Sequence, residues 1–385
     1  MDYFLTEEQL EIKNLARQIT EEKIIPAREH YDRTNEFPWD IVKVIAKSDL
    51  FRVFVPEEYE GMGAGVLAMS LATEELSYGC GGTAICYAAS ALGAYPIILY
   101  GNEEQKSKYL PVIASGEKLA AFALTEPDAG SDVANMRTSA VKDGDYYILN
   151  GTKQWITNGG EADIYTVFAV TNPGKGARGI SCFIVEKDAP GFTFGKKEDK
   201  LGIRASATRE LIFQDCRVPA ANLIAKEGRG FLIAMATFDK SRTSVGAQAL
   251  GIAQAALDEA VKYSKERVQF GAPISSFQGI QFMLADMAMQ IEAARSLVYS
   301  VARFIDGGAQ NVSKEAAMAK AFASDVAMKV TVDAIQILGG YGYMKEYPVE
   351  KMMRDAKITQ IYEGTNQIQR LIIASHLIKE MKTKK

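Results

Sequence analysis

The sequence predicts a mainly α-helical protein with a central β domain. Apolar residues recur at helical spacing in the first and last thirds of the chain. Between them, short runs of β-branched and aromatic residues alternate with turns that contain Gly and Asn. The 385 residues, 48% of them hydrophobic, supply enough apolar side chains for two or three cores. We therefore expect an N-terminal helical domain at residues 1–120, a middle β domain at 121–230 and a C-terminal helical bundle at 231–385.

Helix-start signals organise the first third of the chain. Thr6 is followed three residues later by Gln9, which matches a capping box at a helix N-terminus. The pair Asn102 and Gln105 repeats this pattern. Pro38 is expected at the first helical position of FPWDIVKVIAK. Further helices are predicted for VLAMSLATEELS and for GTAICYAASALGAYPIILY.

Turn chemistry marks the middle segment. The pairs Asp143-Gly144 and Asn150-Gly151 lie between short β-rich runs, and such pairs supply the positive φ that tight hairpins need. The stretches GISCFIVEKDAPGFTF and ATRELIFQDCRVP continue the β pattern to about residue 218. We expect hairpins that turn at both pairs.

Alanine-rich helical patterns return after the β segment. Their lengths and spacing predict an antiparallel bundle of long helices. The expected helices cover residues 230–268, 275–306, 313–338, 346–356 and 366–382.

The charge balance argues against nucleic acid and anionic membranes as partners. The net charge is -4, and the 44 basic and 48 acidic residues are interspersed rather than collected in blocks. We find no apolar run of the ~18 residues that span a bilayer, and MDYFLTEEQL lacks the basic region of a secretion signal. We therefore expect a cytoplasmic protein without a membrane partner.

Cysteine and histidine usage narrows the chemistry. The four cysteines lack CxxC spacing, so we expect buried apolar residues in a reducing compartment. They are Cys80, Cys86, Cys182 and Cys216. His30 and His376 have no second metal ligand nearby in the sequence. We expect no metal site and no histidine-based triad, so acid–base work falls to carboxylates, tyrosines or a cofactor.

Two polar stretches in the middle segment could hold a ligand. LTEPDAGSD, from Leu124 to Asp132, is either a capped turn or a cradle in which Gly130 permits close approach to a carbonyl or phosphate group. QWITNGG places Trp155 near Thr157. A tryptophan on a half-buried strand is usually a core residue, but an aromatic face beside a hydroxyl group also suits a flat heterocycle.

Two further stretches lie near the C-terminus. QILGGYGYMKEYPVEKMMRDAK, from Gln336 to Lys357, has three closely spaced glycines. A helix C-cap explains one of them, and the lack of a preceding strand disfavours a Rossmann loop. IYEGTNQIQR places Glu363 between an aromatic residue and a glycine. Glu363 is either a first-turn acid that complements a helix dipole or a catalytic carboxylate.

Together, ALTEPDAGSD, QILGGYGYMKEYPVEKMMRD and IYEGTNQIQR resemble the two signatures and the catalytic segment of the acyl-CoA dehydrogenase family. The resemblance covers essentially the whole chain and points to short-chain members similar to butyryl-CoA dehydrogenase. It implies a middle domain of β-sandwich or barrel-like form and a C-terminal bundle of four-helix type. It also implies bound FAD and oxidation of an acyl-CoA thioester to its trans-2-enoyl product, with hydride passing from Cβ to flavin N5.

By this resemblance Glu363 is the base that removes the α-proton. Some members take the base from another position, which matches Ser241 here, and a serine cannot serve. The N–H of Glu363 and a flavin hydroxyl would stabilise the enolate oxygen, while Tyr362 and apolar surroundings would raise the pKa of Glu363. The resemblance assigns substrate binding to Ser131, Asp239, Arg242, Tyr362 and Gly364. Asp239 and Arg242 could equally form a helical i,i+3 ion pair.

The flavin contacts implied by the resemblance come from two sets of residues. The first set comprises Phe122, Leu124, Thr125, Gly130, Ser131, Trp155, Ile156, Thr157, Thr365 and Gln367. The second set would meet the adenine and pyrophosphate end from a neighbouring subunit, and comprises Arg267, Phe270, Gln336 and Gly340. Such sharing implies an oligomer, a homotetramer arranged as a dimer of dimers.

The resemblance implies electron-transferring flavoprotein as the electron acceptor and leaves two other enzymes open. An acyl-CoA oxidase would use the same half-reaction but is usually a much longer chain. Relatives in anaerobes run in reverse as enoyl-CoA reductases. A non-enzymatic scaffold would typically have lost the base or the flavin contacts, and this chain retains both.

The acyl tail is expected to be short and uncharged. In the family it points toward a helix that matches residues 80–95, where members that accept dicarboxylic groups have an arginine and this chain has Thr83. No Lys or Arg occurs from Val53 to Gln105, and a buried carboxylate without a cationic partner is costly. The bulk of Tyr87 and Leu92 favours a group near butyryl, and branched or alicyclic acids are also compatible.

Overall fold

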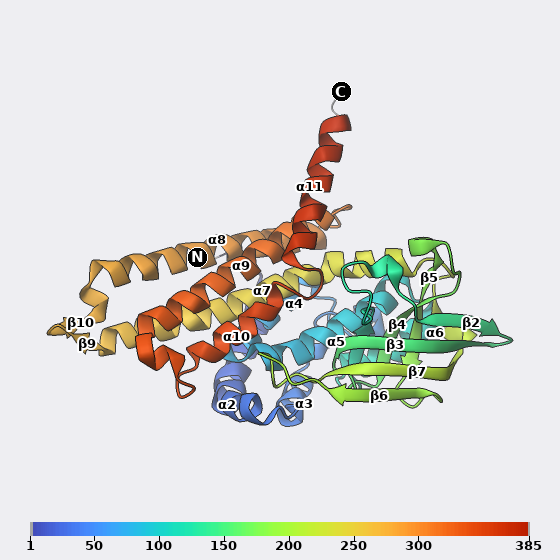
Figure 1. Ribbon diagram of the computed structural model, residues 1–385, viewed down its shortest axis with the longest axis horizontal. Coiled ribbons are helices and arrows are strands. Elements are labelled where there is room, and N and C mark those ends of the chain that lie inside the picture. The colour runs from blue at the N-terminus through green and yellow to red at the C-terminus, as the bar shows by residue number, and fades with distance from the viewer. Residues whose placement is uncertain (1–2, 384–385) are drawn as a thin grey trace.

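The computed structural model describes residues 3–383 and confirms a helical chain with a central β domain (Figure 1). The α-helices before the strands are α1 (Glu7–Ile19), α2 (Ile25–Thr34), α3 (Trp39–Lys47), α4 (Gly65–Gly79), α5 (Gly81–Tyr100) and α6 (Glu103–Ala114). The strands of the middle segment are β1 (Ala120–Ala123), β2 (Ser139–Asp143), β3 (Tyr146–Thr157), β4 (Ile164–Val170), β5 (Ile180–Glu186), β6 (Phe192–Lys197), β7 (Thr208–Pro219) and β8 (Leu223–Ile224). The α-helices that follow are α7 (Gly230–Glu266), α8 (Gln278–Asp306), α9 (Ser313–Leu338), α10 (Val349–Thr359) and α11 (Asn366–Thr383). A small hairpin of β9 (Val268–Gln269) and β10 (Ala272–Pro273) joins α7 to α8. The domain limits at residues 120 and 230 stay predictions.

Both predicted capping boxes are present. Thr6 Oγ1 accepts from the Gln9 N–H at 3.2 Å, and Gln9 Oε1 accepts from the Thr6 N–H at 3.1 Å. Asn102 and Gln105 form the same reciprocal pair. The prediction for Pro38 is wrong by one position, because its ψ of 59° lies outside the helical region and the helix begins at the next residue.

Helix α5 is a buried core helix. It is the one helix within residues 3–383 that is long and apolar enough to cross a membrane, which corrects the expectation that no apolar run reaches that length. In this fold 78% of its most apolar window is buried. Since α5 packs against α4, α7 and β1, its apolar length is explained by the core. The four cysteines are also buried and form no disulfide, as expected.

The strands of the middle domain form one folded sheet. Their order is β6-β7-β3-β2-β4-β5-β8, and β1 pairs with β4. Strands β2 and β4 are joined at a single register pair, Ser139 and Val170, so the sheet divides there into two halves. The halves face each other through aromatic side chains: Tyr147 on β3 meets Phe183 on β5 with ring centroids 4.9 Å apart. This packing gives the expected sandwich-like form.

Only one of the two predicted hairpin turns is present. Gly144, with a φ of 58°, lies in the turn between β2 and β3. Asn150 and Gly151 instead lie inside β3, where the register against β7 shifts and makes a bulge. Asn150 Oδ1 accepts from the Asp215 N–H of β7 at 2.8 Å. The prediction of a second turn is wrong because pairing with β7 on both sides of the bulge outweighs the local turn preference.

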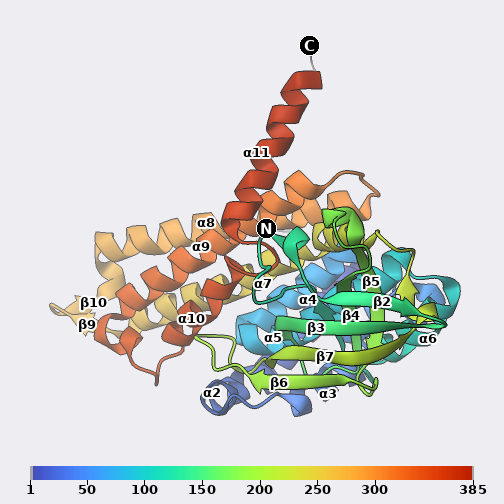
Figure 2. The same ribbon diagram turned by 45° about the vertical axis from the view of Figure 1, so that its right-hand side comes forward.

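The C-terminal helices form the expected bundle except for the last one. Helices α7, α8 and α9 pack along one another, and α10 lies against α7 and α9. Helix α11 contacts α9 near its start and then projects away from the molecule (Figures 1 and 2). Large apolar side chains on α11 are exposed, namely Leu371, Leu377, Ile378 and Met381. An apolar helix that is exposed in this way is typical of a surface that packs against another chain.

Helices α4 and α7 approach each other backbone to backbone at Gly251. A Cβ atom added to Gly251 would lie 2.1 Å from the carbonyl oxygen of Glu74 and 2.9 Å from the amide nitrogen of Tyr78. These distances leave no room for a side chain, so the glycine permits the close spacing of the two helices.

Replacing Gly251 by Ala should lower the free energy of unfolding by about 1–3 kcal/mol, because the added methyl group overpacks two backbones. Gly279 on α8 is a matched control, since a Cβ atom there meets no atom within 4 Å. Gly279→Ala should be neutral or stabilising by about 0.4–1 kcal/mol. Thermal unfolding followed by circular dichroism compares the variants, and equal midpoints would contradict the close-contact argument.

Candidate active site

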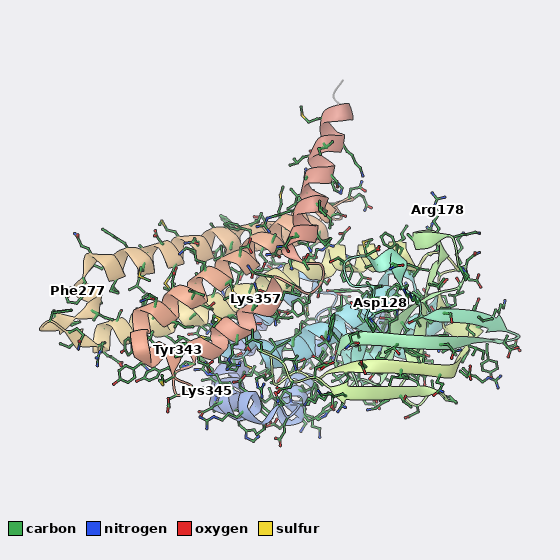
Figure 3. All side chains as sticks on the ribbon, viewed as in Figure 1. Asp128, Arg178, Phe277, Tyr343, Lys345 and Lys357 are labelled. Atoms are coloured by element: carbon green, nitrogen blue, oxygen red, sulfur yellow. The ribbon has the colours of Figure 1, made fainter. Side chains whose placement is uncertain are left out.

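A cleft of about 420 Å³ lies between the β domain and the helices. Its walls come from α5, the loop after β1, the end of β3, the first turns of α7, the α10–α11 loop and the start of α11. The predicted residues that line it are Phe122, Leu124, Thr125, Gly130, Ser131, Trp155, Ile156, Thr157, Arg242, Tyr362, Glu363 and Gly364. The fold therefore brings together residues from four separate stretches of the sequence. In Figure 3, Asp128 marks the loop after β1, beside the helices.

A buried ion pair holds the loop after β1. Lys153 on β3 is fully buried, and its Nζ lies 2.7 Å from Glu126 Oε1 and 3.0 Å from the Leu124 carbonyl oxygen. Burial lowers the pKa of Lys153 to about 8, although Glu126 opposes this shift. Burial raises the pKa of Glu126, but Lys153 and the Arg137 N–H outweigh it, so that pKa is below its usual value. Removing one partner of such a pair typically costs about 3–5 kcal/mol. The pair therefore fixes the loop that carries Thr125.

The end of β3 presents an aromatic face to the cleft. Trp155 has a φ of 55° and is 59% exposed, so it is not a core residue. It adopts this left-handed conformation where the register against β7 shifts just before Ile156. The hydroxyl groups of Thr125, Ser131 and Thr157 form no hydrogen bond with any other residue in the range 3–383. An exposed aromatic face with unpaired hydroxyl groups suits a flat ring that has polar edges.

The α10–α11 loop places Glu363 in the cleft. The φ angles of Glu363 and Gly364 are 52° and 91°, and a left-handed conformation at a non-glycine residue costs about 1–3 kcal/mol. Ser241 Oγ on α7 donates to Glu363 Oε2 at 2.5 Å. Gln369 Nε2 donates to the Glu363 carbonyl oxygen at 3.1 Å, while the Glu363 N–H has no acceptor among the described residues. Since α11 begins at Asn366, Glu363 is not a first-turn helix acid.

The carboxylate of Glu363 has an altered acidity. Burial raises its pKa, and the Ser241 hydrogen bond, Arg242 and Lys320 oppose that rise. The pKa remains above the ordinary value for glutamate. A carboxylate with a raised pKa is a stronger base at neutral pH than an exposed one, so this group is suited to proton abstraction.

Arg242 is the cation among the described residues that line the cleft. It is 3% exposed, its Nη1 lies 3.2 Å from Asp239 Oδ1, and its Nε has no hydrogen-bond partner. Asp239 in turn accepts from Ser313 Oγ at 2.5 Å. Burial raises the pKa of Asp239 and lowers that of Arg242. The i,i+3 ion pair is therefore present, and the Nε of Arg242 is a buried donor without a partner.

A much smaller chamber of about 10 Å³ adjoins Glu363 between α5 and α7. Its other walls are Ile85, Ala88, Ala91, Tyr95, Ser241, Ser244, Val245 and Gln248. No Lys or Arg of the described chain lines it, and Ser244 Oγ is buried without a hydrogen-bond partner. The chamber has room for about one water molecule.

Two residues expected near the acyl tail lie elsewhere. Leu92 lines the cleft as expected, whereas Thr83 and Tyr87 line neither space. The Tyr87 hydroxyl donates to the Leu50 carbonyl oxygen at 3.0 Å, and its ring packs on Phe51. The expectation that Thr83 and Tyr87 shape a tail pocket is wrong, because they occupy the faces of α5 that pack into the core.

The remaining predicted residues are not brought to this cleft. Arg267 and Gly340 line a separate cleft of about 500 Å³. Phe270 is 97% exposed on the β9–β10 hairpin, and Gln336 is exposed near the end of α9. Figure 1 shows this hairpin at the opposite end of the molecule from β2–β7, and Figure 3 labels Phe277 and Tyr343 at the same end. Thr365 and Gln367 follow Glu363 but do not line the cleft.

Sequence reasoning missed two contacts of the Glu363 loop. One is the hydrogen bond from Ser241, and the other is a fully buried lysine, Lys320, which donates to the Gly364 carbonyl oxygen at 2.9 Å. A signal for Lys320 exists in the sequence, because the buried face of α9 is otherwise alanine-rich and a lysine there is unusual. Within residues 3–383, no group of His, Cys, Asp or Glu side chains is arranged to hold a metal ion.

Comparison with known proteins gives three family matches along the chain. The N-terminal domain of acyl-CoA dehydrogenase matches residues 6–117. The middle domain of acyl-CoA dehydrogenase matches residues 121–216, and the C-terminal domain matches residues 228–378.

Individual relatives match over nearly the full length. An acyl-CoA dehydrogenase of Bacillus subtilis (strain 168) is 54% identical over 375 residues, which cover 97% of this chain and 99% of that protein. The structure of butyryl-CoA dehydrogenase from Megasphaera elsdenii is 50% identical, with a TM-score of 0.96, and covers 98% of this chain and 100% of that chain. A chain of the structure reported as "Electron transferring flavoprotein of Acidaminococcus fermentans: Towards a mechanism of flavin-based electron bifurcation" is 54% identical, with a TM-score of 0.96, over 98% of this chain and 99% of that chain. The chain therefore belongs to the acyl-CoA dehydrogenase family of FAD-dependent oxidoreductases.

Proposed function

We propose that the protein oxidises a short-chain acyl-CoA thioester with an uncharged tail to its trans-2-enoyl product, with FAD as the hydride acceptor. The observation that carries this proposal is the carboxylate of Glu363, which a left-handed turn holds in the cleft and whose pKa burial raises. The butyryl-CoA dehydrogenase of Megasphaera elsdenii, with half of its residues identical to this chain, supports the short-chain substrate.

The cleft suits FAD by size and by chemistry. Its volume of about 420 Å³ is within the usual range of ligand pockets, so the cleft can hold part of a large cofactor. The exposed ring of Trp155 and the unpaired hydroxyl groups of Thr125, Ser131 and Thr157 fit a ring with polar edges. We assign FAD contacts to these four residues and to Phe122, Leu124, Gly130 and Ile156, with Thr365 and Gln367 following the base. When bound, FAD accepts the hydride that leaves Cβ.

Glu363 acts as the general base for the α-proton. Ser241 holds Oε2, which leaves Oε1 free to take the proton from Cα. Partial burial raises the pKa of the carboxylate and so keeps its proton affinity high, which favours transfer from a weak carbon acid. The unpaired N–H of Glu363 is a donor for the thioester oxygen, on which negative charge develops.

The remaining polar groups of the cleft bind the thioester and CoA. Arg242 lines the cleft and can attract a CoA oxygen through its charge, and Asp239 orients its guanidinium group. The Tyr362 hydroxyl donates to Gln248, which fixes the ring beside the base. We assign substrate contacts to Arg242, Asp239, Tyr362, Ser131 and Gly364.

The chamber next to Glu363 supports a short, uncharged acyl group. It has a volume of only about 10 Å³, so even a short tail must displace side chains of α5 or α7, and the displacement needed grows with each added methylene group. No cation of the described chain lines this chamber, and a carboxylate placed there would lose its hydration without a partner.

The molecular surface and the relatives support a proposal for the assembly and for the electron acceptor. The exposed apolar residues of α11 and the separate cleft at Arg267 support a homotetramer in which one subunit completes the FAD site of the next. The Acidaminococcus fermentans relative supports an electron-transferring flavoprotein as acceptor.

We place the protein in the cytoplasm. Oxidase and reductase activities would use the same residues, and no contact in the cleft favours either.

Glu363→Gln should keep the fold and bound FAD but slow flavin reduction by butyryl-CoA about 10²–10⁴-fold or more, because the amide cannot take the α-proton. The measurement is the anaerobic loss of flavin absorbance in a stopped-flow instrument. Glu346→Gln is the control, since Glu346 is exposed and lies outside the cleft. Retention of more than about a tenth of the wild-type rate by Glu363→Gln would refute the base assignment.

Butyryl-CoA should have a higher kcat/KM than octanoyl-CoA, a cyclic acyl-CoA or glutaryl-CoA, because the chamber is small and lacks a cation. Val245→Ala enlarges the chamber and should raise the octanoyl/butyryl ratio about 10-fold or more, since each buried methylene group is worth about 1–3 kcal/mol. Steady-state kinetics with the four thioesters test both statements. Efficient oxidation of glutaryl-CoA would mean that a cation reaches the tail from elsewhere.

A shared FAD site predicts complementation between two inactive variants. Arg267→Ala should lose FAD, whereas Glu363→Gln should hold FAD without reacting. Co-expressed mixed oligomers should recover activity, because some sites then combine an intact Glu363 with an intact Arg267 from a second copy. Light scattering establishes that mixed oligomers have formed, and their inactivity would contradict the shared site.

A further inference from the structure

Lys320 on α9 is fully buried and lies beneath the loop that carries Glu363. Its Nζ donates to the Gly364 carbonyl oxygen and to Asn366 Oδ1, both at 2.9 Å. Both acceptors are uncharged, and no carboxylate in the range 3–383 forms an ion pair with this lysine. A buried ammonium group with uncharged partners is costly, so its presence next to the active site calls for an explanation.

The contacts of Lys320 belong to a network that fixes both ends of the loop. Asn366 Nδ2 donates to Asp325 Oδ1 at 2.8 Å, and Gln360 Nε2 donates to the same oxygen at 2.6 Å. The Asn366 N–H also donates to the Gln360 carbonyl oxygen at 3.0 Å. Asp325 on α9 therefore holds the two ends of the loop together. Lys320 supplies the bond to Gly364, which lies between those ends and directly follows the base.

The charge of Lys320 also acts on Glu363. Burial lowers the pKa of Lys320 to about 7, and Arg242 adds to this shift while Glu363 and Asp325 oppose it. In return, Lys320 counteracts the rise of the Glu363 pKa. The two groups thus influence each other's protonation although no hydrogen bond joins them.

We propose that Lys320 is a positioning residue that fixes the Glu363–Gly364 turn through the Gly364 carbonyl group and, as a buried cation, keeps the Glu363 carboxylate ionised. Lys320 does not line the cleft, so it acts through Glu363 and not on the substrate. The inference rests on the proposed function of Glu363 as the base. That function requires an ionised carboxylate at the start of each turnover, whereas burial favours the protonated form.

The other groups around Glu363 come from each element packed against the loop. They are Ser241, Arg242 and Asp239 from α7, Asp325 from α9, Tyr95 from α5, Tyr362 from the loop itself and the neutral Gln369 from α11. Arg242 and Lys320 are the cations among them. Both cations oppose the rise of the Glu363 pKa, Arg242 more strongly than Lys320, but Arg242 already pairs with the Asp239 carboxylate whereas Lys320 has only uncharged hydrogen-bond partners.

Loss of the Lys320 charge should move the acid side of the profile of rate against pH to higher pH. Without the cation the pKa of Glu363 rises, so the base becomes protonated at a higher pH and the acid limb of the rate profile moves upward by about 1 pH unit. The charge of Lys320 is present on this limb, because its own pKa is about 7. At higher pH the carboxylate is ionised in either case, so the plateau rate reports positioning alone.

The test compares FAD-loaded Lys320→Gln and Lys320→Met with wild type. Glutamine keeps a donor for Gly364 and removes the charge, whereas methionine removes both. Lys329→Met is the matched control, because Lys329 lies on the same helix and its exposed side chain pairs with Asp333. The rate of flavin reduction by saturating butyryl-CoA is measured as a function of pH.

The acid limb should shift upward in both Lys320 variants, with a lower plateau only for Lys320→Met, and Lys329→Met should coincide with wild type. A purely structural lysine would lower the plateau or the melting temperature without moving the limb, and that result would overturn the proposal. Lys320→Gln decides the matter if Lys320→Met does not fold.

Two controls separate this inference from the proposed function. An active Glu363→Gln enzyme overturns the base and, with it, the role of Lys320. An inactive Glu363→Gln enzyme together with an unshifted Lys320→Gln profile overturns the role of Lys320 alone.

A second readout is the exchange of the acetyl-CoA α-hydrogens with D₂O, since acetyl-CoA has no β-carbon and cannot be oxidised. This exchange should show the same shift in pH, and an unshifted exchange profile would contradict the proposal.

Discussion

The proposed active site depends on one partly buried carboxylate, that of Glu363, which a strained turn holds in the cleft. Burial favours its protonated form, and the left-handed conformation adds a backbone cost of about 1–3 kcal/mol. The loop between α10 and α11 is short, so the contacts that offset these costs come from neighbouring helices. Helix α7 supplies the Ser241 hydroxyl to the carboxylate, and α9 supplies Lys320 to the backbone. The packing of α9 on α7 therefore determines both the position and the charge of the base.

Helix α7 also separates two parts of the proposed cofactor site. It carries Ser241 beside the base and ends next to Arg267, which lines the second cleft. At a rise of 1.5 Å per residue, the 26 positions between these residues span about 39 Å of helix. One small ligand cannot fill both clefts of a single chain over such a distance. The close contact of α7 with α4 at Gly251 makes this helix a rigid spacer, which favours completion of each site by a second copy.

The sequence predicted the helices, the capping boxes and the order of helical and β segments, because these depend on local spacing and on nearby side chains. It failed where long-range contacts decide the outcome. Asn150 and Gly151 have hairpin chemistry, but pairing with β7 keeps them inside a strand. Thr83 and Tyr87 lie on the predicted helix, yet the sequence does not give the rotation of that helix about its axis, which turns them into the core. Lys320 was missed because its partner, the Gly364 carbonyl, is a backbone atom 44 residues away.

The chemistry of proton transfer gives a reason for a lysine at position 320. Before the reaction, the carboxylate of Glu363 balances the ammonium group of Lys320 in a region with little water. When Glu363 takes the α-proton it becomes neutral, and the buried cation loses its balancing charge. Burial lowers the pKa of Lys320 to about 7, so its charge is held less firmly than that of an arginine, which would remain charged at any working pH. Lysine thus supplies a charge that favours the ionised base and is weaker than the permanent charge of an arginine. The same property explains why uncharged acceptors suffice for Lys320: a permanent carboxylate partner would hold the lysine charged and would remove its sensitivity to the state of Glu363.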